Sequence, residues 1–359
     1  MNILIIQKNT GKAGAQNSLR RLLSTQAFKE HNVVVITGMD GWFVEQMKSL
    51  CIPVLSVKFP GVRSLYGKTI GNKLWTHTVV KALKEHGYIP DILQANNHME
   101  VPFLKLLKKK YVNAKTAVFL RDGYIKKAGY IKYGCHECDF KIAVSQALAN
   151  IISWDESIIV INNGVFENEI FPDNKFKADF PRRWLVIGNP KPGKGWLDFL
   201  SALRLIENAR LAHVERIVFT GKPEGDLKKS YEIACGESKD KLHIEFIEPY
   251  ENLGQACQDF DVVVSPSRKE SFGMAMLEAY SSGKCVIASR TGVSESLILN
   301  SNLLFNPGDI FQLADCLNYV LIKWDDIAAT SSEELNVVKQ RFSVEGNANK
   351  IILLYGSDQ

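Results

Sequence analysis

The stretch Ser265-Pro-Ser-Arg-Lys-Glu270-Ser-Phe-Gly-Met-Ala-Met-Leu-Glu278-Ala279 follows the apolar run 262–264. The apolar run predicts a buried strand, and the residues after it predict a helix that begins near Gly273, with Ser271 as its N-cap. The first turn of a helix presents free backbone N–H groups and the positive end of the helix dipole. The segment therefore predicts an anion site, suited to a diphosphate, at the end of a strand.

The two glutamates of this segment are placed to contact different parts of one extended ligand. Glu270 precedes the expected helix, and Glu278 lies about two turns after Glu270. At 1.5 Å per residue, they would lie about 12 Å apart on a continuous helix, too far to share one metal ion. Because carboxylates accept hydroxyl hydrogen bonds well, a sugar hydroxyl suits the first and a ribose the second.

On both sides of this segment, short β-branched runs alternate with longer amphipathic stretches, which is the pattern of βαβ units. Continuous Val and Ile runs are typical of parallel strands buried on both faces. The fold class expected is α/β, with two Rossmann-like, doubly wound parallel-sheet domains facing each other across a cleft. The expected strands are 2–6, 33–37, 54–57, 91–95, 116–120, 141–144, 158–161, 184–188, 216–220, 242–246, 262–264 and 284–288. The expected helices include 15–25, 74–86, 195–206, 273–282 and 310–322, and a link is expected near 162–177.

The length of 359 residues suits two domains of ordinary size. With 46% hydrophobic and 23% charged residues, the composition excludes fibrous and largely disordered proteins. No apolar stretch approaches the ~20 residues of a membrane helix, and residues 1–7 lack the features of a signal peptide. The expected location is the cytoplasm. Seven scattered cysteines suit a reducing compartment without disulfides, and Cys135-His-Glu-Cys138 lacks the second ligand pair of a zinc site.

Positive charge is concentrated in the first half of the chain. Residues 1–170 contain 22 Lys and Arg against 13 Asp and Glu, whereas residues 171–359 contain 22 against 26. A basic half suggests an anionic partner such as a membrane surface. The run 104–111, which mixes Leu with Lys108, Lys109 and Lys110, fits either a contact with an anionic bilayer or a solvated helix face. Nucleic acid is not expected, because aromatic residues are not interleaved with these basic segments.

The motif Pro-Ser-x-x-Glu270-Ser-Phe-Gly-x-x-x-Leu-Glu278-Ala resembles the hallmark of retaining glycosyltransferases of family 4 (glycosyl transferases group 1), which have the GT-B fold. Further segments are similar to that family in order and spacing over nearly the whole chain. They are 11–19 (first glycine loop), 144–145 with 160–165 (end of the first domain), 188–195 (phosphate loop), 306–309, and the closing segment 341–355. The resemblance implies an acceptor-side domain at 1–165, completed by a returning helix at 342–359, and a donor domain at 166–341.

The resemblance also implies roles for individual residues. Glu270 would bind hydroxyls of the donor sugar, Glu278 the ribose, and Lys194 the leaving diphosphate. Backbone N–H groups of Phe272, Gly273 and Met274 would assist Lys194, and Gly14 would allow close approach of the first loop to the donor phosphate. No cofactor and no metal ion are expected.

Two positions depart from the family pattern. Asn189 stands beside the diphosphate where the family usually has Arg, and Lys191 or Arg268 is a possible replacement for the missing cation. Arg121-Asp122 stands where the family commonly has a His near the donor sugar. His98 and Asp122 are then the candidates for contact with the acceptor, although His98 also suits a structural polar loop.

The function expected from these residues is a nucleotide-sugar-dependent retaining glycosyltransferase. Its acceptor would be a saccharide or lipid-linked saccharide in surface polysaccharide synthesis, at the inner face of the cell membrane. Two alternatives are a nucleotide-sugar epimerase of the same fold, which would lack the Glu270-x7-Glu278 arrangement, and a non-catalytic GT-B scaffold that binds anionic surfaces. The two departures keep the scaffold in consideration.

Overall fold

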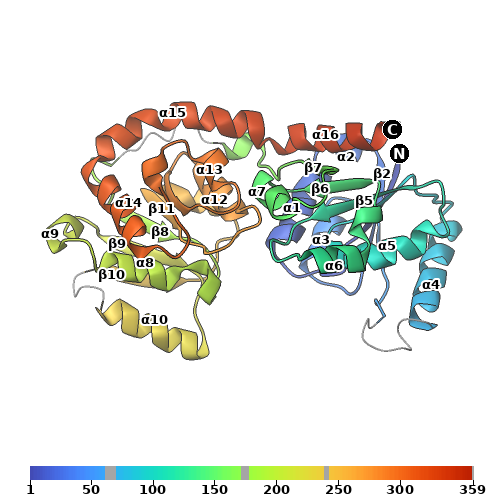
Figure 1. Cartoon of the computed structure of the whole chain (residues 1–359), viewed down its shortest axis with the longest axis horizontal. Coiled ribbons are helices and arrows are strands. Elements are labelled where there is room, and N and C mark those ends of the chain that lie inside the picture. Colours follow the sequence, from blue (N-terminus) through green and yellow to red (C-terminus); the bar gives the residue numbers. More distant parts are fainter. Residues whose placement is uncertain (61–69, 171–177, 238–241, 358–359) are drawn as a thin grey trace. The chain divides into compact units, whose positions relative to one another are not determined.

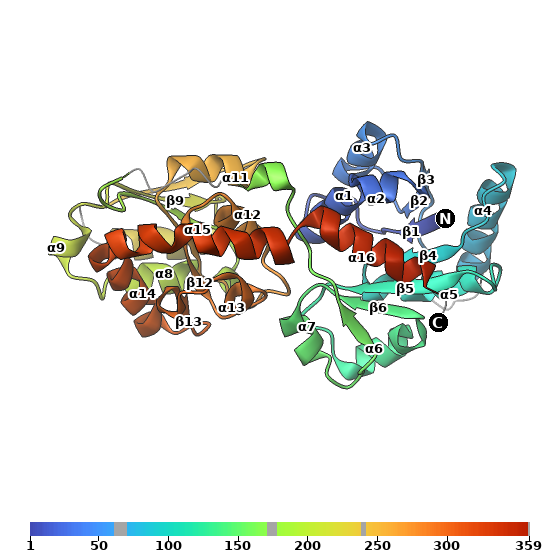
Figure 2. The same cartoon turned by 90° about the horizontal axis from the view of Figure 1, so that it is seen from above.

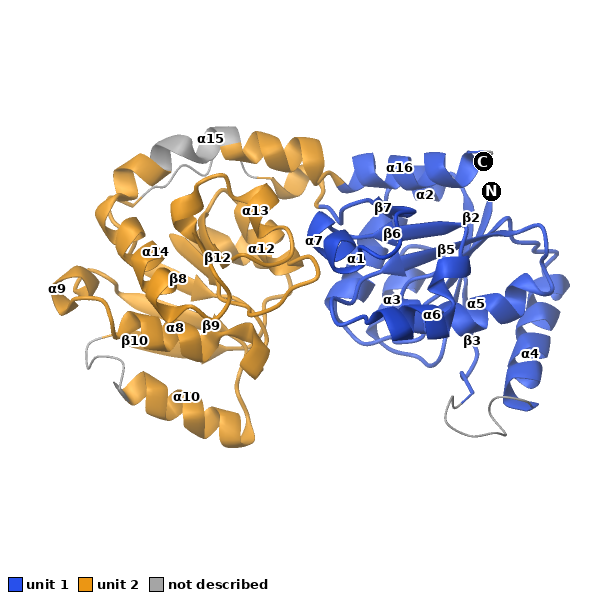
Figure 3. Ribbon diagram, in the orientation of Figure 1, with its two compact units in different colours: residues 1–164, 344–359 blue, residues 165–343 orange. Residues whose placement is uncertain are grey.

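The computed structural model describes residues 1–60, 70–170, 178–237 and 242–357. The chain divides into two compact units, shown in two colours in Figure 3. Unit 1 comprises 1–164 and 344–359, and unit 2 comprises 165–343. Residues 171–177 of the expected link lie outside the described residues.

Unit 1 is built on a seven-stranded, fully parallel sheet in the order β3-β2-β1-β4-β5-β6-β7. Every strand expected in the first half is present within one or two residues. The strands are β1 Asn2–Ile6, β2 Asn32–Thr37, β3 Val54–Ser56, β4 Ile92–Ala95, β5 Lys115–Leu120, β6 Phe140–Ala143 and β7 Ile158–Val160. The direction of strand order changes between β1 and β4, which is where open parallel sheets bind ligands at their carboxyl edge.

The helices of unit 1 include a segment from the end of the described chain. Helix α16 (Val344–Gly356) packs against α1 and α2, as Figure 2 shows from above. Its Tyr355 donates a hydrogen bond from Oη to Gln94 Oε1 at 2.9 Å, which ties the helix to β4. The other helices are α1 Gly14–Leu23, α2 Gln26–Lys29, α3 Trp42–Ser49, α4 Asn72–Glu85, α5 Val101–Lys108, α6 Lys127–Tyr133 and α7 Gln146–Ile151.

Unit 2 is built on a six-stranded parallel sheet in the order β10-β9-β8-β11-β12-β13. The strands are β8 Arg183–Val186, β9 Arg216–Thr220, β10 His243–Ile247, β11 Val262–Ser265, β12 Cys285–Ser289 and β13 Leu304–Phe305. The last of these has only two residues and too little pattern to be predicted. The order again changes direction, between β8 and β11, so the segments after these two strands meet at one edge.

The helices of unit 2 surround this sheet (Figure 1). They are α8 Trp196–Leu203, α9 Asn208–Leu211, α10 Gly225–Glu237, α11 Leu253–Ala256, α12 Met274–Ser281, α13 Ser294–Leu297, α14 Ile310–Ile322 and α15 Trp324–Arg341. The bounds of α14 are those expected from the sequence. The segment expected as a helix from 342 begins as α16 at Val344, after a short break at Phe342 and Ser343 that follows α15.

The apolar runs that suggested parallel sheets form the core of each unit. All four residues of β11 and all of Ile3–Ile6 in β1 are buried. The prediction of two α/β units with parallel sheets is therefore confirmed. Among the described residues, no helix is long and apolar enough to cross a membrane.

Candidate functional site

The loop after β8 is packed tightly onto the loop after β11. Gly195 precedes α8 with a φ of +69°, a left-handed conformation that favours glycine. A Cβ at this position would lie 1.8 Å from the carbonyl oxygen of Pro266. The backbone of Arg268 reinforces the contact by donating a hydrogen bond to the carbonyl of Gly193 at 2.9 Å. Glycine at 195 is therefore required by the fold of this site.

This packing brings Lys194 and Glu270 together. Lys194 ends the short 3-10 helix Pro192–Lys194, and its Nζ forms an ion pair with Glu270 Oε1. The two side chains are 27% and 22% exposed, so both remain accessible at the carboxyl edge of the sheet. The structure thus brings together the cation and the carboxylate to which the sequence assigned the diphosphate and the donor sugar.

Helix α12 begins beside this pair with its first turn open. The prediction of Ser271 as N-cap is wrong: Gly273 is the N-cap, with a φ of +96° and no side-chain hydrogen bond. A serine hydroxyl at Ncap would occupy the N–H groups of the first turn, whereas glycine leaves them exposed. Within the described residues, the N–H groups of Phe272, Gly273 and Met274 donate no hydrogen bond. These are the N–H groups to which the resemblance assigned a role beside Lys194.

The remaining predicted residues of unit 2 lie around this edge. Glu278 is partly exposed on α12, one turn beyond its start. Asn189 is exposed after β8. Arg268 forms a bidentate ion pair with the buried Asp198, at 2.7 and 2.8 Å. This pair also raises the pKa of Arg268. Because Asp198 holds the guanidinium, Arg268 is not a free replacement for the missing arginine, whereas Lys191 is exposed.

In unit 1, Gly14 begins helix α1 after an extended Ala13. A Cβ at Gly14 would meet no atom within 4 Å. Packing within the described chain therefore gives no reason for glycine here, in contrast to Gly195. The role predicted for Gly14, which is to allow close approach of a donor phosphate, stays a prediction.

Arg121 and Asp122 follow β5 at the carboxyl edge of the unit 1 sheet. Arg121 donates from Nε to Asn96 Oδ1 at 3.0 Å and from Nη1 to Asn163 Oδ1 at 2.8 Å. Burial lowers the pKa of Arg121 to about 10, and the negative charge of Glu100 opposes that shift. Asp122 is partly exposed and accepts a hydrogen bond from the backbone N–H of Tyr124 at 2.8 Å.

His98 lies in the interior of unit 1. It is 5% exposed and packs edge-on against Tyr133, with ring centroids 5.5 Å apart. Burial lowers the pKa of His98, and the nearby Asp122 partly opposes the shift. A neutral and buried ring does not reach an acceptor, so the structure supports the structural-loop alternative for this residue.

Two other segments have a simpler explanation in the structure. Cys135 and Cys138 are buried, and burial raises the pKa of both thiols to about 12, which disfavours the thiolate that binds metals. In the basic run, Leu104 and Leu107 belong to the core. These two leucines are therefore not available to a bilayer, whereas Leu106 is partly exposed and Lys109 and Lys110 are exposed. Contact of the run with an anionic membrane stays a prediction.

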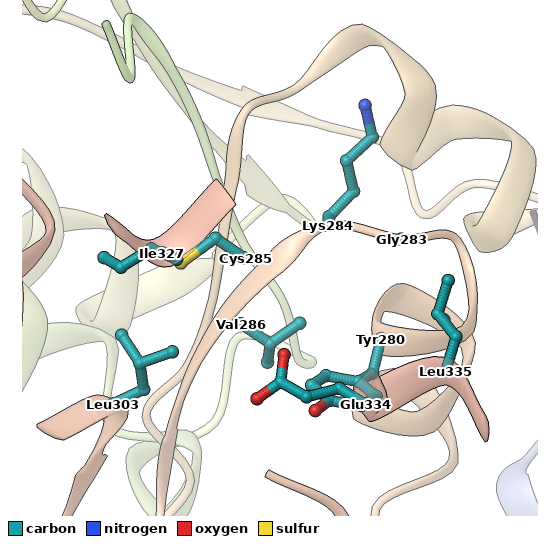
Figure 4. Close-up of a pocket in the computed structure, with 9 residues that line it drawn as sticks. All are labelled: Tyr280, Gly283, Lys284, Cys285, Val286, Leu303, Ile327, Glu334 and Leu335. Atoms are coloured by element: carbon teal, nitrogen blue, oxygen red, sulfur yellow. The ribbon is translucent and has the colours of Figure 1, made fainter. Parts of the chain in front are cut away.

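A separate pocket lies in unit 2 between β12, the end of α12 and α15 (Figure 4). None of the predicted site residues lines it. Its lining is Tyr280, Gly283, Lys284, Cys285, Val286, Leu303, Ile327, Glu334 and Leu335. Burial raises the pKa of Glu334, which favours its neutral form in this mostly apolar setting.

Sequence reasoning missed the amide side chains that organise the edge of unit 1. Asn96 donates from Nδ2 to Gln7 Oε1 and, at 3.4 Å, to the carbonyl of Ala15. Gln7 and Asn96 directly follow the apolar strands β1 and β4 and are 3% and 1% exposed. An amide immediately after a buried strand was the available signal, because parallel strands bring such residues to one edge.

Comparison with known proteins places glycosyltransferases among the relatives of this chain. Residues 181–323, all within unit 2, match the family described as glycosyl transferases group 1. The chain is 32% identical over 219 residues to the D-inositol 3-phosphate glycosyltransferase of Corynebacterium urealyticum. It is 26% identical over 261 residues to an uncharacterised glycosyltransferase of Methanocaldococcus jannaschii. These alignments cover 56% and 69% of this chain but only 51% and 66% of the relatives.

Solved structures extend the likeness of fold to the whole chain. Anabaena HepE in complex with UDP and glucose superposes with a TM-score of 0.79 at 19% identity, and 99% of each chain is covered. The lipopolysaccharide outer core galactosyltransferase WaaB gives a TM-score of 0.74 at 18% identity, again over 99% of each chain. The chain thus has the two-unit fold of these solved structures, and residues 181–323 of unit 2 match the group 1 family.

Proposed function

We propose that the protein is a retaining glycosyltransferase that transfers a sugar from a nucleotide-sugar donor to a saccharide or lipid-linked saccharide acceptor in surface polysaccharide synthesis. The observation that carries this proposal is the Lys194–Glu270 pair beside the open first turn of α12. The pair offers one positive and one negative group that a sugar diphosphate can engage separately. The names of relatives that act on inositol phosphate and lipopolysaccharide support the reaction class.

The donor would be divided between three parts of the unit 2 edge. The diphosphate accepts hydrogen bonds from Lys194 and from the N–H groups of the first turn of α12, and Glu270 accepts from hydroxyls of the sugar. Glu278, farther along the same helix, accepts from the ribose. When the donor binds in this way, the Lys194–Glu270 ion pair is replaced by a contact of Lys194 with phosphate and a contact of Glu270 with a sugar hydroxyl.

Chemistry would then proceed by electrostatic stabilisation of the leaving group. The bond between the anomeric carbon and the diphosphate oxygen breaks, and the acceptor oxygen bonds to the same face of the anomeric carbon. The proton of the acceptor hydroxyl passes to the departing diphosphate oxygen, so no protein base is needed. Lys194 and the helix dipole meet the growing negative charge without a metal ion.

Donor binding can be tested by thermal shift of the full chain with UDP, GDP, ADP, CMP and their common sugar conjugates, without added metal. A ligand that binds only the folded state raises the melting temperature with concentration. We expect a shift with one nucleotide, with UDP as the first candidate because HepE is solved with UDP. The shift should be lost in Glu278→Ala, and a shift that persists in that variant contradicts the assignment.

Transfer can be tested with the identified donor by following nucleotide release and the anomeric configuration of the product. Glu270→Gln keeps the size of the side chain but cannot form the ion pair or accept two hydroxyls as a carboxylate does. We expect turnover to fall by a factor of about 10³ or more. The melting temperature should differ from that of the wild type by no more than about 3 degrees. An inverted product would refute retention, and unchanged turnover would refute the role of Glu270.

A further inference from the structure

Arg268 joins the loop after β11 to the start of helix α8 through an ion pair. Its Nε donates to Asp198 Oδ2 at 2.8 Å, and its Nη2 donates to Asp198 Oδ1 at 2.7 Å. This bidentate geometry uses the planar fork of the guanidinium, so it fixes orientation as well as distance. The side chain of Asp198 is 8% exposed, whereas that of Arg268 is 57% exposed. The arginine is therefore a surface side chain anchored on a buried carboxylate.

The position of Asp198 is set by the core of unit 2. It is the third residue of α8, where the positive end of the helix dipole stabilises a carboxylate. On the same helix, Trp196 packs on Phe219 of β9 and Phe199 packs on Trp184 of β8, with ring centroids 4.9 and 6.4 Å apart. All four rings are fully buried. A group that is paired with Asp198 is thus held relative to the sheet.

The Arg268–Asp198 pair links the same two segments of the chain as the Lys194–Glu270 pair. Lys194 lies four residues before Asp198, and Arg268 lies two residues before Glu270. The backbone N–H of Arg268 adds a hydrogen bond to the carbonyl of Gly193 at 2.9 Å. Two ion pairs and one backbone hydrogen bond therefore hold the loop after β8 to the loop after β11.

Donor binding would affect the two ion pairs differently. In the function proposed above, Lys194 contacts the diphosphate and Glu270 contacts a sugar hydroxyl, so their mutual ion pair is lost. Asp198 is buried and accepts both of its hydrogen bonds from one guanidinium. Breaking this pair would leave a buried charge without a partner, which is costly. The Arg268–Asp198 pair should therefore persist when the other pair opens.

We propose that Arg268 and Asp198 are positioning residues, which keep the loops after β8 and β11 together while a nucleotide sugar occupies the donor site. They act through Lys194 and Glu270, which lie on these two loops. A displacement of about 1 Å of a binding group is enough to weaken its action strongly. The inference rests on the proposed function for the identity of the ligand, whereas the contact between the loops can be tested without one.

The test uses the double variant Asp198→Asn with Arg268→Gln. Replacement of the arginine alone would leave Asp198 buried and unpaired, and would destabilise the fold for that reason. The double variant makes both side chains neutral, and the shorter glutamine lacks the fork of the guanidinium. Glu270→Gln removes the other ion pair, and a triple variant removes both.

Hydrogen exchange of the ligand-free chain, followed by mass spectrometry, measures whether the loops separate. The N–H of residue 268 is the reporter, because it donates across the two loops to the carbonyl of Gly193. We expect it to exchange about tenfold or more faster in the triple variant than in Glu270→Gln. If the triple variant exchanges as slowly as Glu270→Gln, the pair does not hold the loops together, and the proposal is overturned.

Calorimetric titration with UDP, without added metal, measures the effect on ligand binding. We expect Asp198→Asn with Arg268→Gln to bind UDP about tenfold or more weakly than the wild type. An unchanged affinity for UDP also overturns the proposal.

The matched control is Asp261→Asn with Arg183→Gln, at the amino end of the same sheet. In this pair, Arg183 Nη2 donates to Asp261 Oδ1 at 3.1 Å, and the two side chains are 44% and 7% exposed. We expect the control to lower the melting temperature by a comparable amount and to leave the affinity for UDP unchanged. If the control weakens UDP binding equally, the loss reflects general destabilisation, and the positioning role is refuted.

The two measurements separate this inference from the proposed function. Because the exchange experiment needs no ligand, its result does not depend on which nucleotide the chain binds. A wild type that does not bind UDP contradicts UDP as the donor nucleotide. Equal exchange in the triple variant and in Glu270→Gln contradicts the positioning role alone.

Discussion

The carboxyl edges of the two sheets are built by different means. In unit 2, the backbone itself fixes the site, since Gly195 has a left-handed conformation and leaves no room for a Cβ against Pro266. In unit 1, side-chain amides fix the site, and Asn96 connects Arg121 to helix α1. The same parallel-sheet topology thus supports one site determined by backbone fit and another determined by a polar network.

The two edges also differ in their charge balance. In unit 2, Lys194 is paired with Glu270 and Arg268 with Asp198, so these cations are neutralised before any ligand binds. In unit 1, the hydrogen bonds of the Arg121 side chain within the described residues go to neutral amides, and its guanidinium lies over the ring of Phe119. The donor binding proposed for unit 2 would therefore exchange existing partners, whereas Arg121 has no ion-pair partner to exchange among the described residues.

The backbone fit of unit 2 can be tested by substitution of Gly195 with alanine. The new Cβ would lie 1.8 Å from the Pro266 carbonyl oxygen, and the left-handed conformation adds strain. We expect Gly195→Ala to lower the free energy of unfolding by more than about 3 kcal/mol. Urea denaturation followed by circular dichroism measures the change.

The matched control for this substitution lies two residues earlier in the same loop. A Cβ at Gly193 would meet no atom within 4 Å, and this glycine does not have a positive φ. We expect Gly193→Ala to change stability by less than about 0.5 kcal/mol. Equal effects of the two substitutions would show that close packing of these loops does not determine the site.

For unit 1, the buried His98 provides a test by pH. Because burial lowers its pKa in the folded state, the unfolded chain binds a proton near pH 6.5 that the folded chain does not. Stability therefore falls as the pH falls below about 6.5, by at most about 1.4 kcal/mol per pH unit. We expect His98→Gln to remove the part of the decrease in unfolding free energy at low pH that comes from His98.

The measurement is the difference between wild type and His98→Gln in unfolding free energy from pH 7.5 to 5. Taking the difference cancels other titrating groups, including Glu100, whose raised pKa acts in the opposite direction. Parallel pH profiles would mean that His98 binds its proton equally well in the folded and the unfolded chain, and would restore it as a candidate for acceptor contact.

The strands and the site loops were predictable from the sequence for separate reasons. Continuous apolar runs such as Ile3–Ile6 are visible in one dimension, because parallel strands are buried on both faces. The proximity of Lys194 to Glu270 was implied by resemblance and by the rule that ligands bind at strand ends. The two-residue strand β13 gives no such periodic signal.

The misplaced details share a physical cause. Ser271 is a good N-cap by residue type, but a glycine two positions later allows the turn that the site needs. His98 follows a strand as a ligand-binding residue would, yet the packing of α6 and Tyr133 encloses it. Local sequence indicates which residues reach the sheet edge, whereas long-range packing decides which of them face solvent.

The smallest expected effect concerns the outer surfaces of the two units. Lys109 and Lys110 are exposed at the end of α5, whereas Lys108 donates from Nζ to the carbonyls of Val112 and Ala114 at 2.8 and 2.7 Å. A membrane test should therefore leave Lys108 in place, because its replacement would disturb the turn. We expect Lys109→Gln with Lys110→Gln to weaken binding to vesicles that contain anionic phospholipid severalfold, at less than about 1 kcal/mol per lysine.

The control for this change is the same neutralisation on unit 2, with Lys228→Gln and Lys229→Gln on α10. Lys228 and Lys229 are exposed, and Lys228 pairs with Glu232. Replacing both lysines removes two positive charges, as the change on unit 1 does, but from a different surface. Attraction to a charged bilayer is screened within about a Debye length, so the effect of the unit 1 change should vanish as salt is raised to 0.5 M, where that length is roughly 4 Å. A membrane-binding surface confined to unit 1 requires that only the Lys109 and Lys110 substitutions weaken vesicle binding. Equal weakening by the two double substitutions would show that net charge alone governs binding.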